Sequence, residues 1–214
     1  MEPLFADRLD AGLRLGHALS DYAGGDAMVV GLARGGVEVG YATAQYLRLP
    51  LTVLVVRKVG APRNPELAIG AVSETGVRWL DREIAAATGA DERYIQVEVA
   101  RQVSEAQRRS ETYGTAAALE AIRERPAIVV DDGIATGATA LVALQSVREL
   151  GSREVILATP VASLPAVTSL LRVADSVVAL ETPEQFGAVG LYYGNFGQVS
   201  DEEVLRYVEM SADR

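Results

Sequence analysis

The chain has 214 residues, enough for one domain with a full hydrophobic core, and its apolar content of 49% excludes a disordered chain. It contains no cysteine, which excludes disulfides and thiolate chemistry. A net charge of −9 argues against non-specific binding to nucleic acid or to an anionic membrane, while an anionic substrate is compatible with it wherever basic residues converge.

Neither a leader nor a membrane span is indicated by the sequence. Met1 to Phe5 lacks a basic stretch followed by an apolar one. No apolar run approaches the roughly 20 residues that cross a bilayer. We therefore expect a cytoplasmic protein that binds no membrane and no nucleic acid.

The first predicted element is an amphipathic helix over residues 8–20. Leu9, Leu13 and the pair Ala18-Leu19 are expected to form its apolar side. His17, the only histidine, lies on this helix. A position on the helix surface explains it better than a catalytic role does.

A buried strand with a glycine loop is predicted next. Residues 28–32 form the strand, Ala33-Arg34-Gly35-Gly36 the loop and residues 37–47 a helix. Free amides at the start of a helix bind anions, and Arg34 can pair with two phosphate oxygens at once. A turn with two glycines is common after a strand, so this loop alone indicates an anion site only weakly.

Arg57 and Lys58 follow another predicted strand, residues 51–56. Adjacent cations at a strand end often just form a solvated edge, and the alternative is that they face an anionic ligand. Glycine and proline in residues 59–66 then predict a loop. Residues 67–72 and 77–80 are predicted to form a hairpin.

Two helices are expected between this hairpin and the middle of the chain. Asp81 can cap a short helix that ends near Gly89. A long helical region follows over residues 91–119, with an interruption near Gly114. Its arginines and glutamates recur three or four residues apart, which predicts exposed ion pairs, the alternative being that one arginine reaches a phosphate.

The most informative stretch is a predicted buried strand, residues 127–130, followed by two acids and a loop. Successive amides in that loop, at the start of the next helix, would bind a phosphate. The acids would repel a phosphate but suit ribose hydroxyls, or a magnesium ion bound to them. The acids are Asp131 and Asp132, and the loop is Gly133, Ile134, Ala135, Thr136, Gly137, Ala138 and Thr139.

Other interpretations of this stretch explain less of it. An ordinary strand–turn–helix with an acidic turn is the less favoured alternative. No Gly-Lys-Ser/Thr follows, which excludes a Walker A loop, and no Gly-x-Gly-x-x-Gly is present. A phospho-acceptor aspartate at the strand end would not use the glycine and threonine loop.

Strands and helices alternate through the rest of the chain. Residues 139–150 and 165–173 are predicted helices, and residues 155–159 and 176–180 are predicted strands. The alternation predicts an α/β fold: a doubly wound, mainly parallel sheet with helices on both faces, in a single domain over residues 1–214.

The last irregular stretch, residues 181–198, is rich in glycine and aromatic residues. Its rings could stack on a flat base, or they could pack the loop onto the sheet. They are Phe186, Tyr192, Tyr193 and Phe196. Ser200 and Glu203 then predict a capping box for the final helix.

The run from Val129 to Thr139, together with the two apolar residues before it, resembles the phosphoribosyl diphosphate (PRPP) signature of type I phosphoribosyltransferases: four apolar residues, two acids and Thr-Gly-x-Thr. The resemblance extends from about Phe5 to Met210, and it is greatest to bacterial members whose acceptor is unassigned. It implies transfer of the 5-phosphoribosyl group from PRPP to a nitrogenous acceptor, such as a nucleobase, with magnesium as cofactor and release of pyrophosphate.

The resemblance also implies roles for the individual residues. Asp131 and Asp132 would hold the ribose hydroxyls and their magnesium, and residues 133–139 the 5-phosphate. Pyrophosphate would be bound by Arg34, Gly35, Gly36, Arg57 and Lys58, with Arg34 and Lys58 acting in catalysis. An insertion of about residues 57–90 would close over the site as a lid. A hood of about residues 181–199 would select the acceptor through Phe186, Tyr192 and Tyr193.

Some expectations stay open at this point. Some purine-salvage relatives carry an acid where this chain has Ala135, so the hypoxanthine/guanine type is disfavoured and no general base is identified. A homodimer is compatible with the resemblance. The alternative to an enzyme is a regulatory protein that binds PRPP or a nucleotide without turnover, because regulators have adopted this fold.

Overall fold

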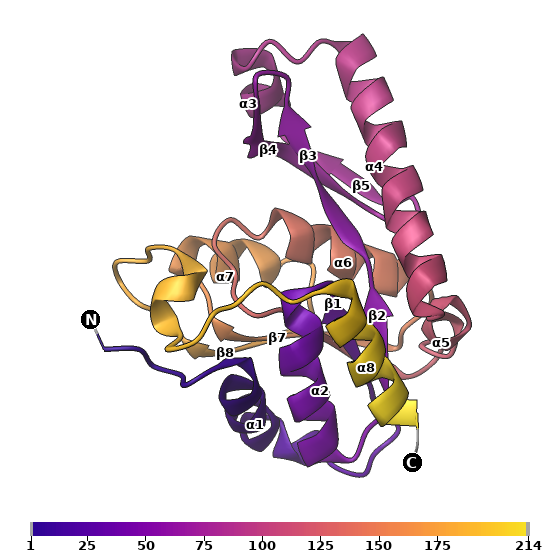
Figure 1. The fold of residues 1–214 in the computed structure, drawn as a ribbon, viewed down its shortest axis with the longest axis vertical. Helices are drawn as coiled ribbons and strands as arrows, with labels where there is room; N and C mark the ends of the chain where they lie inside the picture. Colours follow the sequence, from indigo (N-terminus) through magenta and orange to yellow (C-terminus); the bar gives the residue numbers. More distant parts are fainter. Residues whose placement is uncertain (1, 213–214) are drawn as a thin grey trace.

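The computed structural model describes residues 2–212 and is built around a five-stranded parallel sheet with the strand order β2-β1-β6-β7-β8 (Figure 1). All neighbouring strands in it run parallel. The strands are β1 (Met28–Leu32), β2 (Leu51–Leu54), β6 (Pro126–Val130), β7 (Glu154–Val161) and β8 (Ser176–Glu181).

Helices cover both faces of this sheet, which confirms the predicted doubly wound α/β fold. The helices on one face are α1 (Arg8–Ala18), α2 (Gly35–Leu47) and α8 (Asp201–Ala212); those on the other are α5 (Ala116–Glu120), α6 (Ala138–Glu149) and α7 (Leu164–Leu170). Short 3-10 turns are η1 (Ser20–Tyr22) and η2 (Val189–Tyr192). No helix within residues 2–212 is long and apolar enough to cross a membrane.

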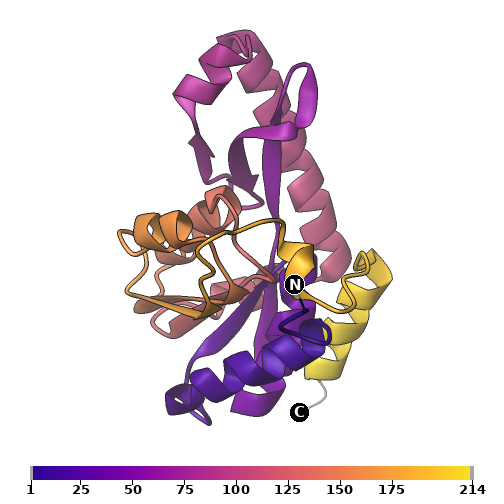
Figure 2. The ribbon, with the colours of Figure 1, turned by 90° about the vertical axis from the view of Figure 1, so that its left-hand side faces the viewer.

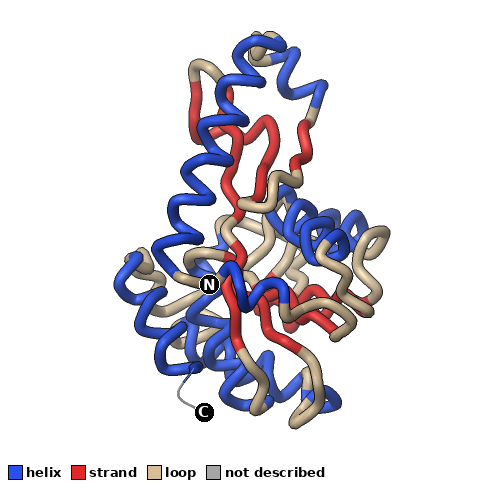
Figure 3. The backbone as a smooth tube through the Cα atoms, turned by 90° about the vertical axis from the view of Figure 1, so that its right-hand side faces the viewer, coloured by secondary structure: helices blue, strands red, loops and turns tan. Residues whose placement is uncertain are grey.

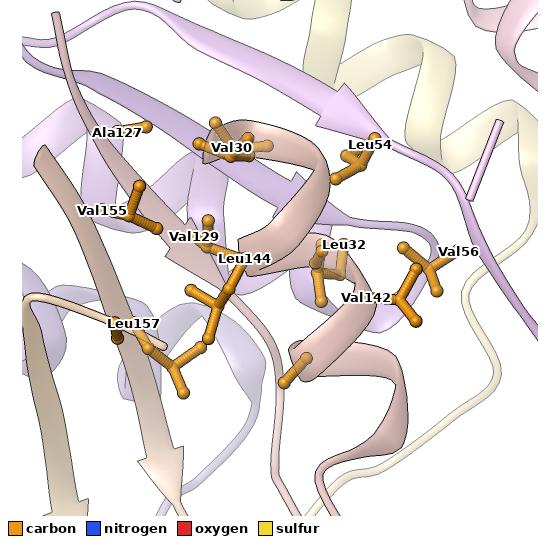
Figure 4. Close-up of a cluster of buried hydrophobic side chains, with 14 of the residues drawn as sticks. Val30, Leu32, Leu54, Val56, Ala127, Val129, Val142, Leu144, Val155 and Leu157 are labelled. Atoms are coloured by element: carbon orange, nitrogen blue, oxygen red, sulfur yellow. The ribbon is translucent and has the colours of Figure 1, made fainter. Parts of the chain in front are cut away.

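Strand β6 is apolar throughout because both faces of the sheet are covered at its position. Successive side chains of a strand point to opposite faces. Val129 packs on the α6 side, among Val142 and Leu144 of that helix (Figure 4), whereas Val130 packs on the side of α1 and α2. All five residues of β6 are therefore buried, and the acids that follow are the first polar residues at the end of the strand.

Residues 56–113, called the arm below, project from the sheet (Figures 1 and 2). The arm consists of an antiparallel sheet, β3 (Val56–Ala61), β4 (Asn64–Ser73) and β5 (Arg78–Leu80), with α3 (Arg82–Ala87) and α4 (Glu92–Tyr113). It has a small hydrophobic core of its own, to which Val59, Ile69 and Val99 belong. The predicted insertion is thus a folded unit rather than a simple loop.

The prediction of a loop over residues 59–66 is wrong. β3 continues to Ala61, and β4 starts at Asn64, so only a two-residue turn separates them (Figure 3). The pairing of β3 with β4 shifts register around Gly60. Glycine and proline, which indicate a loop by composition, here mark an irregular hairpin.

The apolar side predicted for the first helix is only partly correct: Leu19 is buried as predicted, whereas Ala18, Leu9 and Leu13 are exposed. Helix α1 buries Ala11 and Leu15, whereas Leu13 is 50% exposed and Leu9 is 36% exposed. The buried face includes Gly12 and Gly16, which let α1 approach α2 closely, and large apolar residues alone therefore do not identify it. His17 is exposed, as expected.

The predicted helix ends are confirmed. Asp81 accepts hydrogen bonds from the amides of Glu83 and Ile84. Gly114, in the left-handed region with φ of 65°, ends α4 before α5 begins. The capping box also forms, with Ser200 N to Glu203 Oε2 at 2.8 Å and Glu203 N to Ser200 Oγ at 3.2 Å.

Replacing Ser200 with alanine is expected to lower the free energy of unfolding by about 1 kcal/mol, the usual effect of losing a capping hydroxyl. Denaturant unfolding with circular dichroism detection measures it. Thr168→Ala is a suitable comparison, since its hydroxyl bonds only to Leu164 O within its own exposed helix. Equal stabilities of the two variants would show that the cap contributes nothing.

Candidate active site

The two predicted loops lie next to each other at the point where the sheet reverses its direction of winding. The chain leaves β1 toward β2 on one side and β6 toward β7 on the other, while β1 and β6 are neighbours. Gly31 and Val130, near the ends of these strands, are register partners. Ligands of open α/β sheets bind at such a switch point, outside the carboxyl ends of the strands.

The two acids at the end of β6 are partly exposed and differ in their partners. Asp132 Oδ2 accepts a hydrogen bond from Arg8 Nε at 2.8 Å. Asp131 Oδ1 accepts one from Asp132 N at 3.0 Å, and no cation of residues 2–212 lies within ion-pair distance of it. Asp131 is therefore the carboxylate with free acceptor capacity.

Burial raises the pKa of both carboxyls. For Asp131 the negative charge of Asp132 adds to the effect of burial, so its pKa is well above the ordinary value. For Asp132 the adjacent Arg8 guanidinium opposes the effect of burial. A ligand that brings positive charge or hydroxyl donors to this pair would therefore be bound favourably.

The loop after the acids presents unpaired backbone donors. Within residues 2–212, the amides of residues 135–139 have no acceptor, whereas the amide of Ile134 donates to Val161 O at 2.9 Å. Ala135 and Thr136 are exposed. Gly137, with φ of 83°, turns the chain into α6. Consecutive free amides at a helix N-terminus form an anion-binding site, from which the bonded Ile134 amide is excluded.

The glycine loop after β1 lies directly against the acids. A Cβ atom on Gly35 would overlap Asp132 Oδ2, and one on Gly36 would lie 2.9 Å from Asp131 Cα. Only glycine allows the start of α2 to approach the end of β6 this closely. The amides of Gly35 and Gly36 have no acceptor in the described chain, so a second group of free donors flanks the acids.

Arg34 lies at the edge of the site and is held by α8. Its Nη1 is 3.6 Å from Asp201 Oδ1, and the Tyr113 hydroxyl donates to the same carboxylate at 2.6 Å. Burial and the charge of Asp201 raise the pKa of Tyr113, which therefore stays a neutral donor. The peptide bond between Ala33 and Arg34 is cis.

Arg57 and Lys58 are not at the end of a sheet strand, so their predicted placement is wrong. They lie within β3 of the arm because the strand after β2 continues past Val55 into a second sheet. Arg57 Nε donates to Gln102 at 2.8 Å, and Lys58 Nζ donates to Glu66 O and Oε2. Burial chiefly lowers the pKa of Arg57, with smaller effects from other arginines that include Arg34.

The aromatic residues predicted to face the acceptor are largely buried. Tyr192 and Tyr193 are only 1% and 5% exposed, and they pack with Phe5 in a small cluster. Phe186 packs on Tyr192, with ring centroids 5.5 Å apart. These positions favour the alternative in which the rings hold the segment onto the sheet.

Arg8 is a site residue that the sequence analysis missed. It contacts Asp132 from 124 positions away, a separation at which no local pattern predicts contact. The one available signal was its spacing: Arg8 shares a helical face with Ala11 and Leu15, which are buried. A charge on the buried face of a helix indicates a specific partner.

The fold and the paired loops define a doubly wound α/β protein in which two groups of free amides and a pair of acids meet at the switch point. Residues 15–193 match the family described as phosphoribosyl transferase domain. A crystal structure of TT1426 from Thermus thermophilus is 43% identical, with a TM-score of 0.74, and the match covers 95% of this chain and 97% of that chain.

Two curated proteins of Mycobacterium tuberculosis are also similar. They are named "Putative phosphoribosyl transferase Rv0571c" in strain H37Rv and "Putative phosphoribosyl transferase MT0597" in strain CDC 1551, and each is 44% identical over 206 residues. The chain belongs to the type I phosphoribosyltransferase family. It spans about half the length of these two curated relatives, with 96% of this chain and 46% of each relative covered.

Proposed function

We propose that this protein transfers the 5-phosphoribosyl group of PRPP to a nitrogenous acceptor, a nucleobase being the favoured class, with release of pyrophosphate. The observation that supports this most is the order of groups at the switch point. Free amides lie on both sides of a pair of acids, in residues 35–36 and residues 135–139. PRPP has the matching order: a diphosphate, two ribose hydroxyls and a 5-phosphate.

In this assignment each loop binds one end of the substrate. Residues 135–139 hold the 5-phosphate through their amides, and Thr136 and Thr139 add hydroxyl donors. Asp131 accepts hydrogen bonds from the ribose hydroxyls. Asp132, held in place by its hydrogen bond from Arg8, forms the other side of the ribose site. Arg34 and the amides of Gly35 and Gly36 hold the diphosphate.

The reaction separates charge at C1 of the ribose. The C1–O bond breaks and its electron pair leaves on the pyrophosphate oxygen, while the acceptor nitrogen donates its lone pair to form the new C1–N bond and loses any proton it carried. Negative charge grows on the leaving group, so donors that are already oriented there lower the barrier. Arg34 and the free amides of Gly35 and Gly36 fill that role.

Magnesium fits the site only as a partner of the substrate. No group of three or more metal-ligating side chains occurs in residues 2–212. Magnesium is commonly held by one or two carboxylates plus substrate oxygens, which Asp131 and Asp132 can supply through ribose hydroxyls and water. When bound, it would offset the charge of the diphosphate.

The arm is assigned to closure over the site, and the hood, residues 181–199, to selection of the acceptor. Arg57 and Lys58 would act on pyrophosphate only if the arm moves toward the sheet, because their present partners are Gln102 and Glu66. Of the three rings assigned to the acceptor, Phe186 is half-buried, whereas Tyr192 and Tyr193 are buried. It is therefore the favoured contact for an acceptor base.

The direct test is a screen for pyrophosphate release with PRPP, magnesium and individual nucleobases and small amines. The proposal expects release that depends on one acceptor and is lost in Arg34→Gln. Arg153→Gln, at an exposed ion pair with Asp26, is the matched control. Binding of PRPP without release for any acceptor would instead identify a regulatory protein.

Replacing Asp131 with asparagine is expected to weaken PRPP binding in the presence of magnesium by about 10- to 100-fold, the size of losing a hydrogen bond to a charged group. Stability should not fall, because burial already disfavours the charged form of Asp131. Isothermal titration and thermal unfolding measure the two effects. Asp26→Asn is the control, and equal affinities of the two variants would contradict the assignment.

A further inference from the structure

Arg8 is buried to an extent that is unusual for a cation, with 6% of its surface exposed. A buried guanidinium is costly unless its donors are paired. Its partners come from separate parts of the chain. Nε donates to Asp132 Oδ2 and Nη1 to Gly197 O, each at 2.8 Å, and Nη1 lies 3.8 Å from Glu38 Oε2.

The hood is attached to Asp132 through two routes. In the first, the Arg8 guanidinium lies over the ring of Phe196, with Cζ 3.9 Å from the centroid, and bonds to Asp132. In the second, the Tyr193 hydroxyl donates to the backbone oxygen of Asp132. The rings of Tyr193 and Phe196 pack against each other with centroids 5.0 Å apart and a tilt of 30°, which joins the two routes.

The hood segment itself has little else to hold it. Residues 194–198 are exposed and have no regular secondary structure. Within residues 2–212, their backbone donors reach only Phe5 O, Ala6 O and a side chain within the segment. Residues 194–198 lie between the buried Tyr193 and Val199, and a segment with few buried contacts of its own opens easily. The Arg8 contacts to Gly197 and Phe196 are therefore expected to help fix its position.

We propose that Arg8 is a positioning residue that couples residues 193–199 of the hood to Asp132, so that occupation of the acidic pair orders the hood. Coupling between two sites is reciprocal, so an ordered hood in turn strengthens binding at the acids. The identity of the ligand at the acids rests on the proposed function; the attachment of the hood through Arg8 does not.

Hydrogen–deuterium exchange of the full chain tests this coupling, with and without PRPP and magnesium. Arg8→Gln removes the charge, and Arg8→Lys keeps it but cannot reach both Asp132 and Gly197 with one ammonium. Arg14→Gln is the matched control: Arg14 lies on the same helix and over the ring of Phe5, but its ion pair with Asp10 is exposed.

In the wild type and in Arg14→Gln, PRPP is expected to slow exchange in peptides that cover residues 133–139 and residues 193–199. In Arg8→Lys the protection of residues 133–139 by PRPP is kept, whereas the protection of residues 193–199 falls at least about fivefold, at the low end of typical coupling. In Arg8→Gln the protection of residues 193–199 by PRPP is lost, and the affinity for PRPP falls roughly tenfold. Phe196→Leu, which keeps the ion pair, replaces Arg8→Gln if that variant does not fold.

A purely structural role for Arg8 would lower the melting temperature but leave the ligand-dependent protection of residues 193–199 intact, and this result would overturn the proposal. If the wild type does not bind PRPP, the proposed function fails. The attachment is then judged without ligand: exchange of residues 193–199 faster in both Arg8 variants than in Arg14→Gln supports it, and equal exchange refutes it.

Discussion

Gly36→Ala is expected to lower the free energy of unfolding by about 1–3 kcal/mol, the range for overpacking a close-packed site, and to abolish PRPP binding. The new Cβ would lie 2.5 Å from Val130 O and 2.9 Å from Asp131 Cα. Both neighbours are backbone atoms, so relief requires α2 to move away from the end of β6. That movement separates the two groups of free amides that are assigned to one substrate.

Gly40→Ala, four residues further along α2, is the matched control. Its Cβ would lie 3.4 Å from Gly31 Cα and from Leu51 Cδ1, an ordinary contact, and alanine in a helix is favoured by up to about 1 kcal/mol over glycine. We expect unchanged binding and equal or greater stability. Denaturant unfolding and PRPP titration of both variants measure these effects. Full PRPP binding by Gly36→Ala would show that the close approach of α2 to the end of β6 is not required.

Glu74→Gln is expected to remove a large pH dependence of stability. Glu74 is 8% exposed and lies where the arm joins the sheet, with Oε1 3.4 Å from Val55 N. Its Oε2 is buried without a hydrogen-bond partner in residues 2–212. Burial raises the pKa of Glu74 from 4.5 to about 7, with a hydrogen bond from Ser110 opposing the effect.

Because the folded state binds this proton more tightly than the unfolded state, the contribution of Glu74 to stability is complete below pH 4.5. It is lost as the pH rises to about 7. The loss amounts to about 3 kcal/mol for a shift of this size. The stability of Glu74→Gln relative to the wild type should therefore rise by that amount between pH 4 and pH 8.

Urea unfolding at several pH values measures this difference, and Glu120→Gln, at an exposed position of α5, is the control. A fixed offset of Glu74→Gln at all pH values would show that Glu74 keeps the same protonation state in the folded and unfolded chain.

Much of the central fold was predictable because its signals are local. Short apolar runs that alternate with helical patterns, such as residues 28–32 and 126–130, are typical of strands in a buried parallel sheet. Gly114 and the Ser200 capping box mark helix ends through their own backbone chemistry. Each of these features depends on residues close together in the sequence.

The arm and the surroundings of Asp132 were not predictable for the opposite reason. Whether Arg57 ends one strand or begins another depends on α4 providing a second core, to which Val99 contributes. The contact between Arg8 and Asp132 depends on how α1 packs across the sheet. Such contacts are set by tertiary packing, which overrides composition.

The binding of PRPP compared with its two halves tests the central claim most directly. Isothermal titration with magnesium should give PRPP a higher affinity than either ribose 5-phosphate or pyrophosphate, because residues 35–36 and residues 135–139 would act on one molecule. Each half should compete with PRPP. PRPP that binds no more tightly than pyrophosphate alone, or not at all, would contradict the assignment of the switch point as a PRPP site.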